Sequence, residues 1–285
     1  MLRSRPGRDP VTNDGAGSAG HQYMDHSFVI PVYGVGPHLT VLIESLQAQT
    51  GLRSEIVLSS STPSTELSAV SKRFGLPLHI NPQRIDIAAD WNFALGKAET
   101  QFVTLAHQDD IFAPGYVVQM GSALRRNPDA FLAFCDYSEH TQLGARPVNI
   151  NLKIKRMLRR RAFGVREYIT EARDKMRLLS LGNPICCPSV MLNCRSIGDF
   201  RFPGGFKTNL DWMAWLELAR RPGGFVYVRE CLVSKGVHAD SETTFTIANR
   251  AREREDRAIF DTLWPKPVAA ALATLYRFGY RANRS

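Results

Sequence analysis

The sequence FVTLAHQDDIFAPGY, residues 102–116, is an apolar run that ends abruptly in two adjacent carboxylates. Its first five residues are unbroken β-formers, which is typical of a buried central strand. Asp109 and Asp110 follow at the carboxyl end of that strand, where ligands bind in open α/β sheets. Two such charges repel each other when partly buried, and Mg²⁺ or Mn²⁺ would relieve the repulsion. The alternative is that one of them only caps the helix predicted to begin near Tyr116.

On both sides of this stretch, short apolar runs alternate with helical periodicities. Strands are predicted at 28–32, 55–58, 78–80, 102–107 and 131–135, and helices at 39–46, 67–74, 87–98 and 116–127. Alternating units of this kind specify a parallel sheet with helices on both faces. We therefore predict an α/β fold, Rossmann-like, with a mostly parallel mixed sheet.

The rest of the chain is less regular. Residues 138–164 show no sustained period and are predicted to be irregular. Beyond them, helices are predicted at 165–181, 210–220, 243–260 and 268–278, and strands at 189–192 and 225–228. The last two helices are expected to form a C-terminal extension.

Composition restricts the class of protein. No apolar run approaches the roughly 20 residues that span a bilayer. The polar residues 1–25 lack the apolar segment of a secretory signal and are predicted to be a disordered tail. The five cysteines are odd in number and contain no C-x-x-C pair, so neither a disulfide framework nor a zinc site is indicated. This cysteine usage favours a cytoplasmic location.

The net charge of +9 is concentrated in the C-terminal half. Residues 1–150 carry a net −3 and residues 151–285 a net +12, with the run KIKRMLRRR at 153–161. This run is either a solvated surface, a loop over a phosphate-bearing ligand, or a contact with anionic membrane. It lacks aromatic interleaving and a known module, so nucleic-acid binding is not expected.

Four segments together resemble the family 2 glycosyltransferases, which have the GT-A fold. They are FVIPVYG at 28–34, LIESLQAQTGLRSEIVL at 42–58, DWNFALGKAETQFVTLAHQDD at 90–110 and GGFKTNLDW at 204–212. The resemblance covers roughly residues 27–244. It implies a tail at 1–25, a GT-A domain at 26–244 with a nucleotide-sugar half (26–136) and an acceptor half (137–244), and a helical extension at 245–285.

The resemblance also implies roles for individual residues. Asp109 is expected to coordinate a Mn²⁺ or Mg²⁺ ion that bridges the donor diphosphate, and His238 stands where some relatives have a second metal ligand. His107 takes the first acidic position of the family's metal motif, and Ser59 stands where many members place an acidic residue against the base. The residues expected to contact the nucleotide sugar are Pro31, Tyr33, Ser59, Arg84, Asn92, His107, Gln108 and Asp110.

Asp211 is the candidate general base. It is the lone carboxylate among Leu210, Trp212 and Trp215, and an apolar setting raises the pKa of a carboxyl group. The alternative is that Asp211 is the N-cap of the helix predicted at 210–220.

These residues lead to one predicted function and several alternatives. We predict an inverting, metal-dependent transferase that moves a sugar from a nucleotide-diphosphate donor to a glycan or lipid-linked hydroxyl acceptor, in cell-surface polysaccharide or glycolipid synthesis. We expect it in the cytoplasm, with peripheral contact to anionic membrane. The replacements at His107 and Ser59 motivate the alternative of an inactive GT-A module that binds sugar nucleotide or glycan. A nicotinamide-dependent enzyme is excluded because the turn at 34–37 is not G-x-G-x-x-G.

Overall fold

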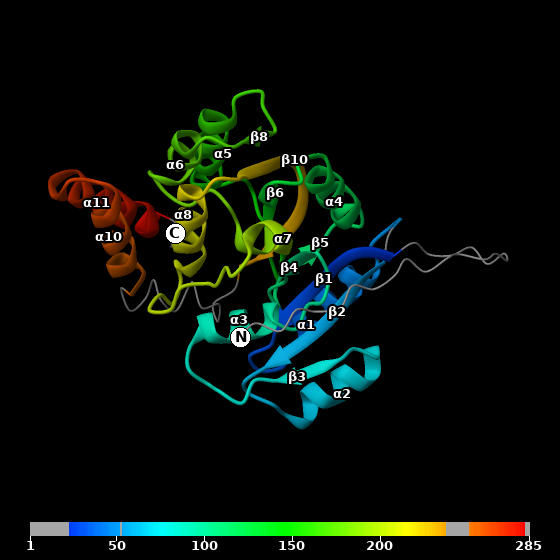
Figure 1. Ribbon diagram of the computed structural model, residues 1–285. Coiled ribbons are helices and arrows are strands. Elements are labelled where there is room, and N and C mark those ends of the chain that lie inside the picture. Colours follow the sequence, from blue (N-terminus) through cyan, green and yellow to red (C-terminus); the bar gives the residue numbers. More distant parts are fainter. Residues whose placement is uncertain (1–22, 52, 238–250, 283–285) are drawn as a thin grey trace, which may run out of the picture.

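The computed structural model describes residues 23–51, 53–237 and 251–282. Its strands are β1 (Tyr23–Pro31), β2 (Arg53–Ser60), β3 (Leu78–Ile80), β4 (Phe102–Leu105), β5 (Ile111–Phe112), β6 (Ala130–Thr141), β7 (Gly144–Ala145), β8 (Tyr168–Ile169), β9 (Val190–Asn193) and β10 (Gly224–Gly236). They form one sheet in the order β3-β2-β1-β4-β9-β6-β10-β5, with β7 beside β6 and β8 beside β10 (Figure 1).

The sheet is mixed, as the sequence predicts. Strand β1 pairs in parallel with β2 and β4, as do β2 with β3 and β6 with β10. Strand β9 runs antiparallel to both β4 and β6 and joins the two halves of the sheet. The sheet therefore continues through both of the halves predicted for the GT-A domain.

The helices are α1 (Pro37–Gln47), α2 (Thr65–Phe74), α3 (Ile87–Leu95), α4 (Tyr116–Arg126), α5 (Ile150–Phe163), α6 (Ala172–Leu179), α7 (Cys194–Ile197), α8 (Leu210–Arg220), α10 (Ala251–Leu263) and α11 (Lys266–Ala282), with a 3₁₀ turn at Cys187–Ser189. They cover both faces of the sheet. Because side chains alternate along a strand, Phe28 and Ile30 pack on the face covered by α1 and α4, whereas Val29 packs on the face covered by α3 and α8.

The expectation that residues 138–164 are irregular is wrong. Strand β6 extends to Thr141, and α5 occupies residues 150–163. The side chain of Asn149 caps α5 by accepting the N–H of Leu152 at 2.9 Å. Arg159 is fully buried and paired with Asp136. A charged residue therefore occupies the interior face of this helix, where the sequence pattern would require an apolar one.

Two other predicted elements are also corrected. The helix predicted at 165–181 is only the shorter α6, preceded by the two residues of β8. The strand predicted at 225–228 is the first part of β10, whose pairing with β6 shifts register around Cys231 and then continues to Gly236. Because the pairing is irregular there, the polar residues in the middle of β10 do not show the alternation of apolar and polar side chains that is typical of a strand.

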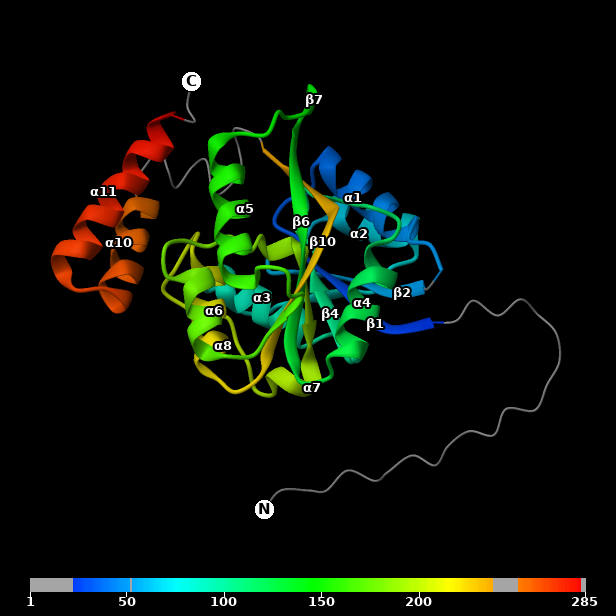
Figure 2. The ribbon, with the colours of Figure 1, turned by 90° about the horizontal axis from the view of Figure 1, so that it is seen from above.

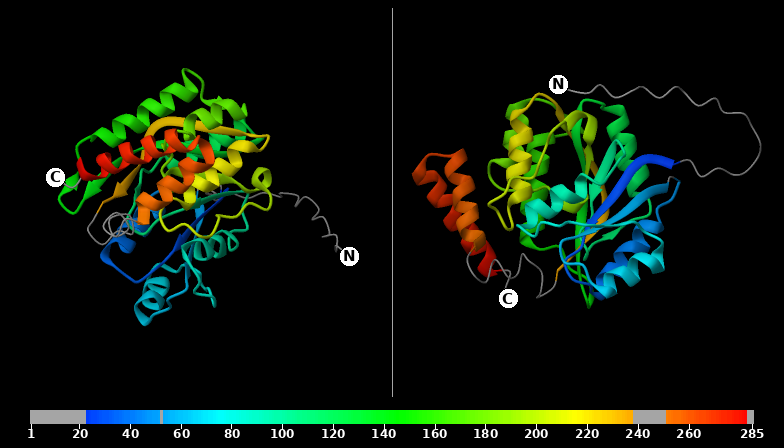
Figure 3. Two further views of the ribbon diagram at one scale, coloured as in Figure 1. Left: turned by 90° about the vertical axis from the view of Figure 1, so that its left-hand side faces the viewer. Right: turned by 60° about the horizontal axis from the view of Figure 1, so that its bottom comes forward.

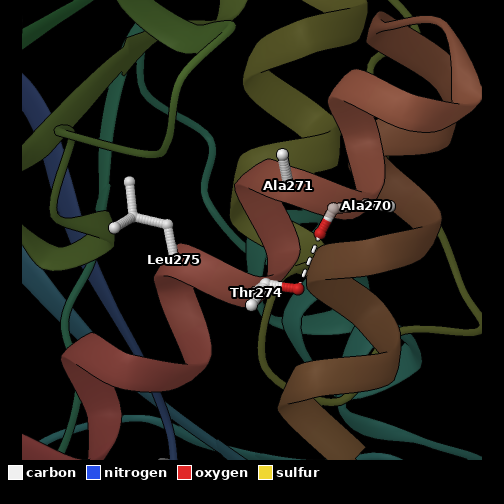
Figure 4. A pocket seen from close by; sticks show the side chains of 4 residues that line it. All are labelled: Ala270, Ala271, Thr274 and Leu275. Atoms are coloured by element: carbon white, nitrogen blue, oxygen red, sulfur yellow. Dashed lines mark hydrogen bonds between the residues drawn. The ribbon is translucent and has the colours of Figure 1, made fainter.

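Helices α10 and α11 form a hairpin at one edge of the molecule, as Figures 2 and 3 show. Ile259, Phe260 and Ala269 are its buried contacts with the main core. Its outer side has a shallow hollow formed by Ala270, Ala271, Thr274 and Leu275 of α11 (Figure 4). These side chains are uncharged, and Thr274 donates its hydroxyl back to the Ala270 carbonyl at 2.8 Å, so the hollow offers nothing that would recognise a nucleotide.

None of the helices in the described ranges combines the length and the apolar character needed to cross a membrane.

Candidate active site

The carboxylates Asp109 and Asp110 lie at the carboxyl end of β4, as predicted. All four residues of β4 are buried, and the pairing with β1 ends where Ala106 donates its N–H to the carbonyl of Val29 at 3.0 Å. The chain then turns, with the N–H of Asp110 donating to the carbonyl of His107 at 3.2 Å. Neither carboxylate caps α4, whose N-cap is Gly115. The local sequence therefore directs both carboxylates to the edge where open sheets bind ligands.

Asp110 is buried against the end of β10. One of its oxygens, Oδ1, accepts the N–H of Gly236 at 3.1 Å, while Oδ2 is buried with no hydrogen-bond partner among the described residues. Burial, with the neighbouring charge of Asp109, raises the pKa of Asp110 well above its usual value, although Lys235 and the Gly236 N–H act in the opposite direction. A buried oxygen without a partner is costly and points to a group that is brought by a ligand.

His107 is held neutral. Burial lowers its pKa to about 4 despite the opposing effect of Asp109, and Lys235 adds a smaller lowering effect. The imidazole lies 4.9 Å from the ring of Trp91, centroid to centroid, and its buried Nε2 has no hydrogen-bond partner in the described part of the chain. His107 therefore contributes no negative charge to this strand end.

Three of the predicted donor-side residues form one hydrogen-bonded group at the rim. Gln108 accepts the N–H of Tyr33 at 2.8 Å and donates to the carbonyl of Gly34 at 2.9 Å. Arg84 donates to the hydroxyl of Tyr33 at 2.8 Å, and its guanidinium lies 5.4 Å from the ring centroid. The side chain of Tyr33 remains 69% exposed, so this group presents an aromatic face and a cation to solvent.

The other predicted donor-side residues lie in the supporting structure. Pro31 pairs with Ser59 across β1 and β2, and Ser59 is buried. Asn92 uses its side-chain amide for two hydrogen bonds with the backbone of Phe202, at 2.9 and 2.8 Å. It thereby fastens α3 to the segment before α8, and its contact with the donor stays a prediction.

Asp211 lies in the first turn of α8, whose N-cap is Asn209, so the N-cap alternative is wrong. Its Oδ2 accepts the side-chain N–H of Asn183 at 2.9 Å, and its Oδ1 accepts the N–H of Trp212 at 2.7 Å. Burial raises the pKa of Asp211, an effect opposed by the Trp212 N–H and by Arg252, Lys155 and Lys235.

Two lysines act electrostatically on Asp211, and one of them, Lys235, also acts on Asp110. Lys235 of β10 influences the titration of both Asp110 and Asp211, and its own pKa is raised because nearby anionic groups outweigh its burial. Lys155 of α5 donates to the hydroxyl of Tyr137 at 2.8 Å, and burial with the neighbouring cations lowers its pKa to about 8. Sequence reasoning missed both lysines, one inside a basic run and the other alone at a strand end.

Comparisons with known proteins identify the family and the fold. The family model described as "Glycosyl transferase family 2" matches residues 27–199, more than half of the chain. The chain belongs to this family. A search of curated protein sequences found no match.

Solved structures of glycosyltransferases share the fold. TarS 1–349 of S. aureus matches with a TM-score of 0.60 and 13% identity over 88% of this chain and 69% of that one. The mannosyltransferase PcManGT from Pyrobaculum calidifontis, solved with GDP-Man and Mn²⁺, matches with a TM-score of 0.58 and 15% identity over 89% of this chain and 69% of that one. The GT-A fold predicted from the sequence is thereby confirmed.

The divalent ion implied by the family fits the strand-end carboxylates. In the described ranges no cluster of three or more His, Cys, Asp or Glu side chains is arranged to hold a metal, and His238 lies outside those ranges. However, Mg²⁺ is commonly held by only one or two carboxylates together with substrate phosphates. Asp109 is half-buried and next in sequence to Asp110, whose Oδ2 has no hydrogen-bond partner in the described part of the chain, so this pair meets that requirement.

Glycine at position 236 is expected to be essential for the position of Asp109, and hence for sugar transfer. A Cβ at this position would lie 2.2 Å from the carbonyl oxygen of Asp109 and 2.9 Å from its Cβ. Gly236→Ala must therefore displace Asp109, and we expect transfer to fall by about 10²-fold, as misplacements of about 1 Å do. The control is Gly96→Ala, where the Cβ meets backbone oxygens at an ordinary 3.4 Å. Equal transfer rates for the two variants would show that the close approach is not needed.

Proposed function

We propose that this glycosyltransferase is an inverting, metal-dependent enzyme that transfers a sugar from a nucleotide-diphosphate donor to a hydroxyl acceptor. The observation that carries the proposal is that Gly236, at the end of β10, donates its N–H to Asp110 at 3.1 Å, while the adjacent Lys235 acts electrostatically on both Asp110 and Asp211. A leaving-group side and a base side thus share one site. The biological setting we propose is the synthesis of cell-surface polysaccharide or glycolipid.

The donor is proposed to bind across the end of β4. The exposed ring of Tyr33 provides a stacking surface for a base, and the guanidinium of Arg84 is within reach of phosphate. The structures of TarS with UDP-GlcNAc and of PcManGT with GDP-Man make a nucleotide sugar the expected ligand class. Mn²⁺ or Mg²⁺, held by Asp109, would neutralise the charge that develops on the diphosphate.

The acceptor is proposed to be activated by Asp211. Its carboxylate takes the proton of the acceptor hydroxyl as that oxygen forms a bond to the anomeric carbon. The bond between the anomeric carbon and the diphosphate oxygen breaks on the opposite face, and the nucleoside diphosphate leaves with the electron pair. One displacement inverts the configuration. Asn183 orients the carboxylate by its hydrogen bond to Oδ2.

The test is a thermal-shift screen of nucleotide sugars with and without Mn²⁺, followed by donor hydrolysis and transfer assays. A donor that binds the native state raises the melting temperature, and we expect Mn²⁺ to enlarge the effect. Binding without hydrolysis or transfer to any hydroxyl acceptor would favour the inactive binding module. Absence of any stabilising nucleotide sugar would overturn both functions.

Transfer is expected to rise as the pH increases through the raised pKa of Asp211, because only the ionised carboxylate accepts a proton. Asn183 contacts this carboxyl group, and Arg252 of α10, Lys155 of α5, Lys235 of β10 and the buried Cys187 interact with it electrostatically. Removing a cation in Lys155→Met should raise the pKa further and move the acidic limb of the rate profile to higher pH. An acidic limb that stays in place in Lys155→Met would contradict the assignment.

A second proposal concerns the basic run, which lies on α5. Ile150, Ile154 and Met157 are exposed at helical spacing, and Lys153, Arg160 and Arg161 are exposed beside them. The other cations of the run have internal roles, including Arg159 with Asp136 and Lys155 with Tyr137. An apolar stripe with flanking cations suits the surface of an anionic bilayer.

We expect salt-sensitive sedimentation with anionic vesicles, because each basic residue contributes about 1 kcal/mol near such a surface and salt screens it. Arg160→Ala/Arg161→Ala should weaken the attachment. The control is Arg125→Ala/Arg126→Ala, the equivalent exposed pair in the last turn of α4. Equal sedimentation with neutral and anionic vesicles, or equal losses in both double variants, would contradict this contact.

A further inference from the structure

The segment just before Asp211 is held by the C-terminal hairpin and not by its own helix. The N-cap of α8, Asn209, makes no side-chain capping bond of its own. Glu255 of α10 instead binds the backbone of the three residues that lead into the helix. Its two carboxylate oxygens accept the N–H groups of Lys207, Thr208 and Asn209 at 2.7, 3.0 and 3.0 Å and the hydroxyl of Thr208 at 2.8 Å.

The neighbouring residue of α10 strengthens this connection. Asp256 is buried and accepts the side-chain N–H of Asn209, also buried, at 2.8 Å. A carboxylate at a helix N-terminus is further favoured by the helix dipole. Two consecutive acidic residues, 46 to 48 positions along the chain from their partners, therefore hold the segment that leads into α8.

The hairpin also holds the other neighbour of Asp211. Asn183, which bonds Asp211 Oδ2, follows a segment whose carbonyls accept from the hairpin: Ser180 from Trp264 Nε1 and Leu181 from the hydroxyl of Tyr276, both at 2.8 Å. A Cβ on Gly182 would lie 1.7 Å from that hydroxyl, so only glycine permits this approach.

Aromatic packing joins the two attachments. The ring of Trp212, the residue after Asp211, lies 5.4 Å from the ring of Phe260 and 6.3 Å from that of Tyr276, centroid to centroid. All three side chains belong to one packed group that includes both helices of the hairpin. Both hydrogen-bond partners of Asp211, Asn183 and Trp212, are thus attached, directly or within a few residues, to α10 or α11.

We infer that the α10–α11 hairpin positions the general base and that Glu255 is the positioning residue on which this depends. The inference rests on the proposed role of Asp211 and adds a function to a part of the chain beyond the matched residues 27–199. Hydrogen bonds from backbone N–H groups to a carboxylate are among the strong ones. Without them the donors of residues 207–209 lose their acceptors, and Asp211 moves with the segment.

The experiment compares Glu255→Gln with Glu253→Gln. Glutamine preserves size but replaces one acceptor oxygen by a donor, which opposes the N–H groups it faces. Glu253 is on the same helix and makes no hydrogen bond to residues 207–209 within the described structure. We expect Glu255→Gln to lower kcat by about 10- to 100-fold, leave the donor KM unchanged and speed amide exchange at residues 207–211. Glu253→Gln should change none of these.

Three results would decide against the inference or its basis. Full kcat in a folded Glu255→Gln protein, where Asp211→Asn is inactive, overturns the inference and leaves the proposed function intact. The inference is also overturned if the lower activity of Glu255→Gln comes only from a higher donor KM or only from a lower global stability. Full transfer by Asp211→Asn overturns the base assignment and the inference together. If Glu255→Gln does not fold, Tyr276→Phe tests the second attachment, and it should lower kcat with the donor KM unchanged.

Discussion

Asp211→Asn is expected to lower sugar transfer by about 10²–10⁴-fold, the usual contribution of a positioned proton transfer. The amide cannot take up the proton of the hydroxyl substrate. It preserves the size of the side chain and one oxygen that accepts the N–H of Trp212. Donor affinity and its metal dependence should stay unchanged, because in our proposal Asp211 contacts neither. The measurements are turnover with a hydroxyl acceptor and donor binding on the same preparation.

The control for Asp211→Asn is Glu217→Gln, a carboxylate on the exposed side of the same helix. It should leave both transfer and donor binding at the wild-type level. A purely structural role would give a lower melting temperature and normal turnover per folded molecule in Asp211→Asn. Full turnover in a well-folded Asp211→Asn protein would contradict its role as base and direct attention to Asp110.

Asp109→Asn is expected to abolish the Mn²⁺-dependent part of donor binding while the fold persists. The amide loses the charge that attracts the ion, and the buried Asp110, whose pKa is raised, does not replace it. At a ligand concentration about 100 times its Kd, binding stabilises a protein by about 2.7 kcal/mol, so loss of the Mn²⁺-dependent thermal shift is readily measured. Asp199→Asn, an exposed carboxylate, is the control. Unchanged Mn²⁺-dependent nucleotide affinity in Asp109→Asn would rule out this metal site.

The sequence predicted the N-terminal part of the fold well, because apolar strands and capped helices alternate there in a local pattern. It failed at α5 because Arg159 occupies an interior position and pairs with Asp136, a contact that no periodicity reveals. The antiparallel direction of β9 could not be predicted either, because a short apolar run is compatible with both parallel and antiparallel pairing.

At the site, sequence reasoning identified Asp109, Asp110 and Asp211 as candidates from their local surroundings. It missed Gly236, which donates to Asp110 from 126 residues away along the chain, and the adjacent Lys235, both at the end of an irregular strand. It also missed Glu255, since a charged residue on a charged helix carries no local sign of a partner. What the sequence omits is therefore the set of contacts between segments that are distant in the chain.

The insertion of β9 between β4 and β6 has a consequence for biosynthesis. When β4 and β6 have left the ribosome, the strand that fills the space between them, residues 190–193, has still to be translated. Until it arrives, buried strands of the nascent chain present open edges, which are templates for aggregation. Such distant pairings also slow folding, because the intervening chain must first be ordered. A fragment that ends at residue 141 should accordingly depend on chaperones, whereas one that continues past residue 193 can join β4 to β6 through β9.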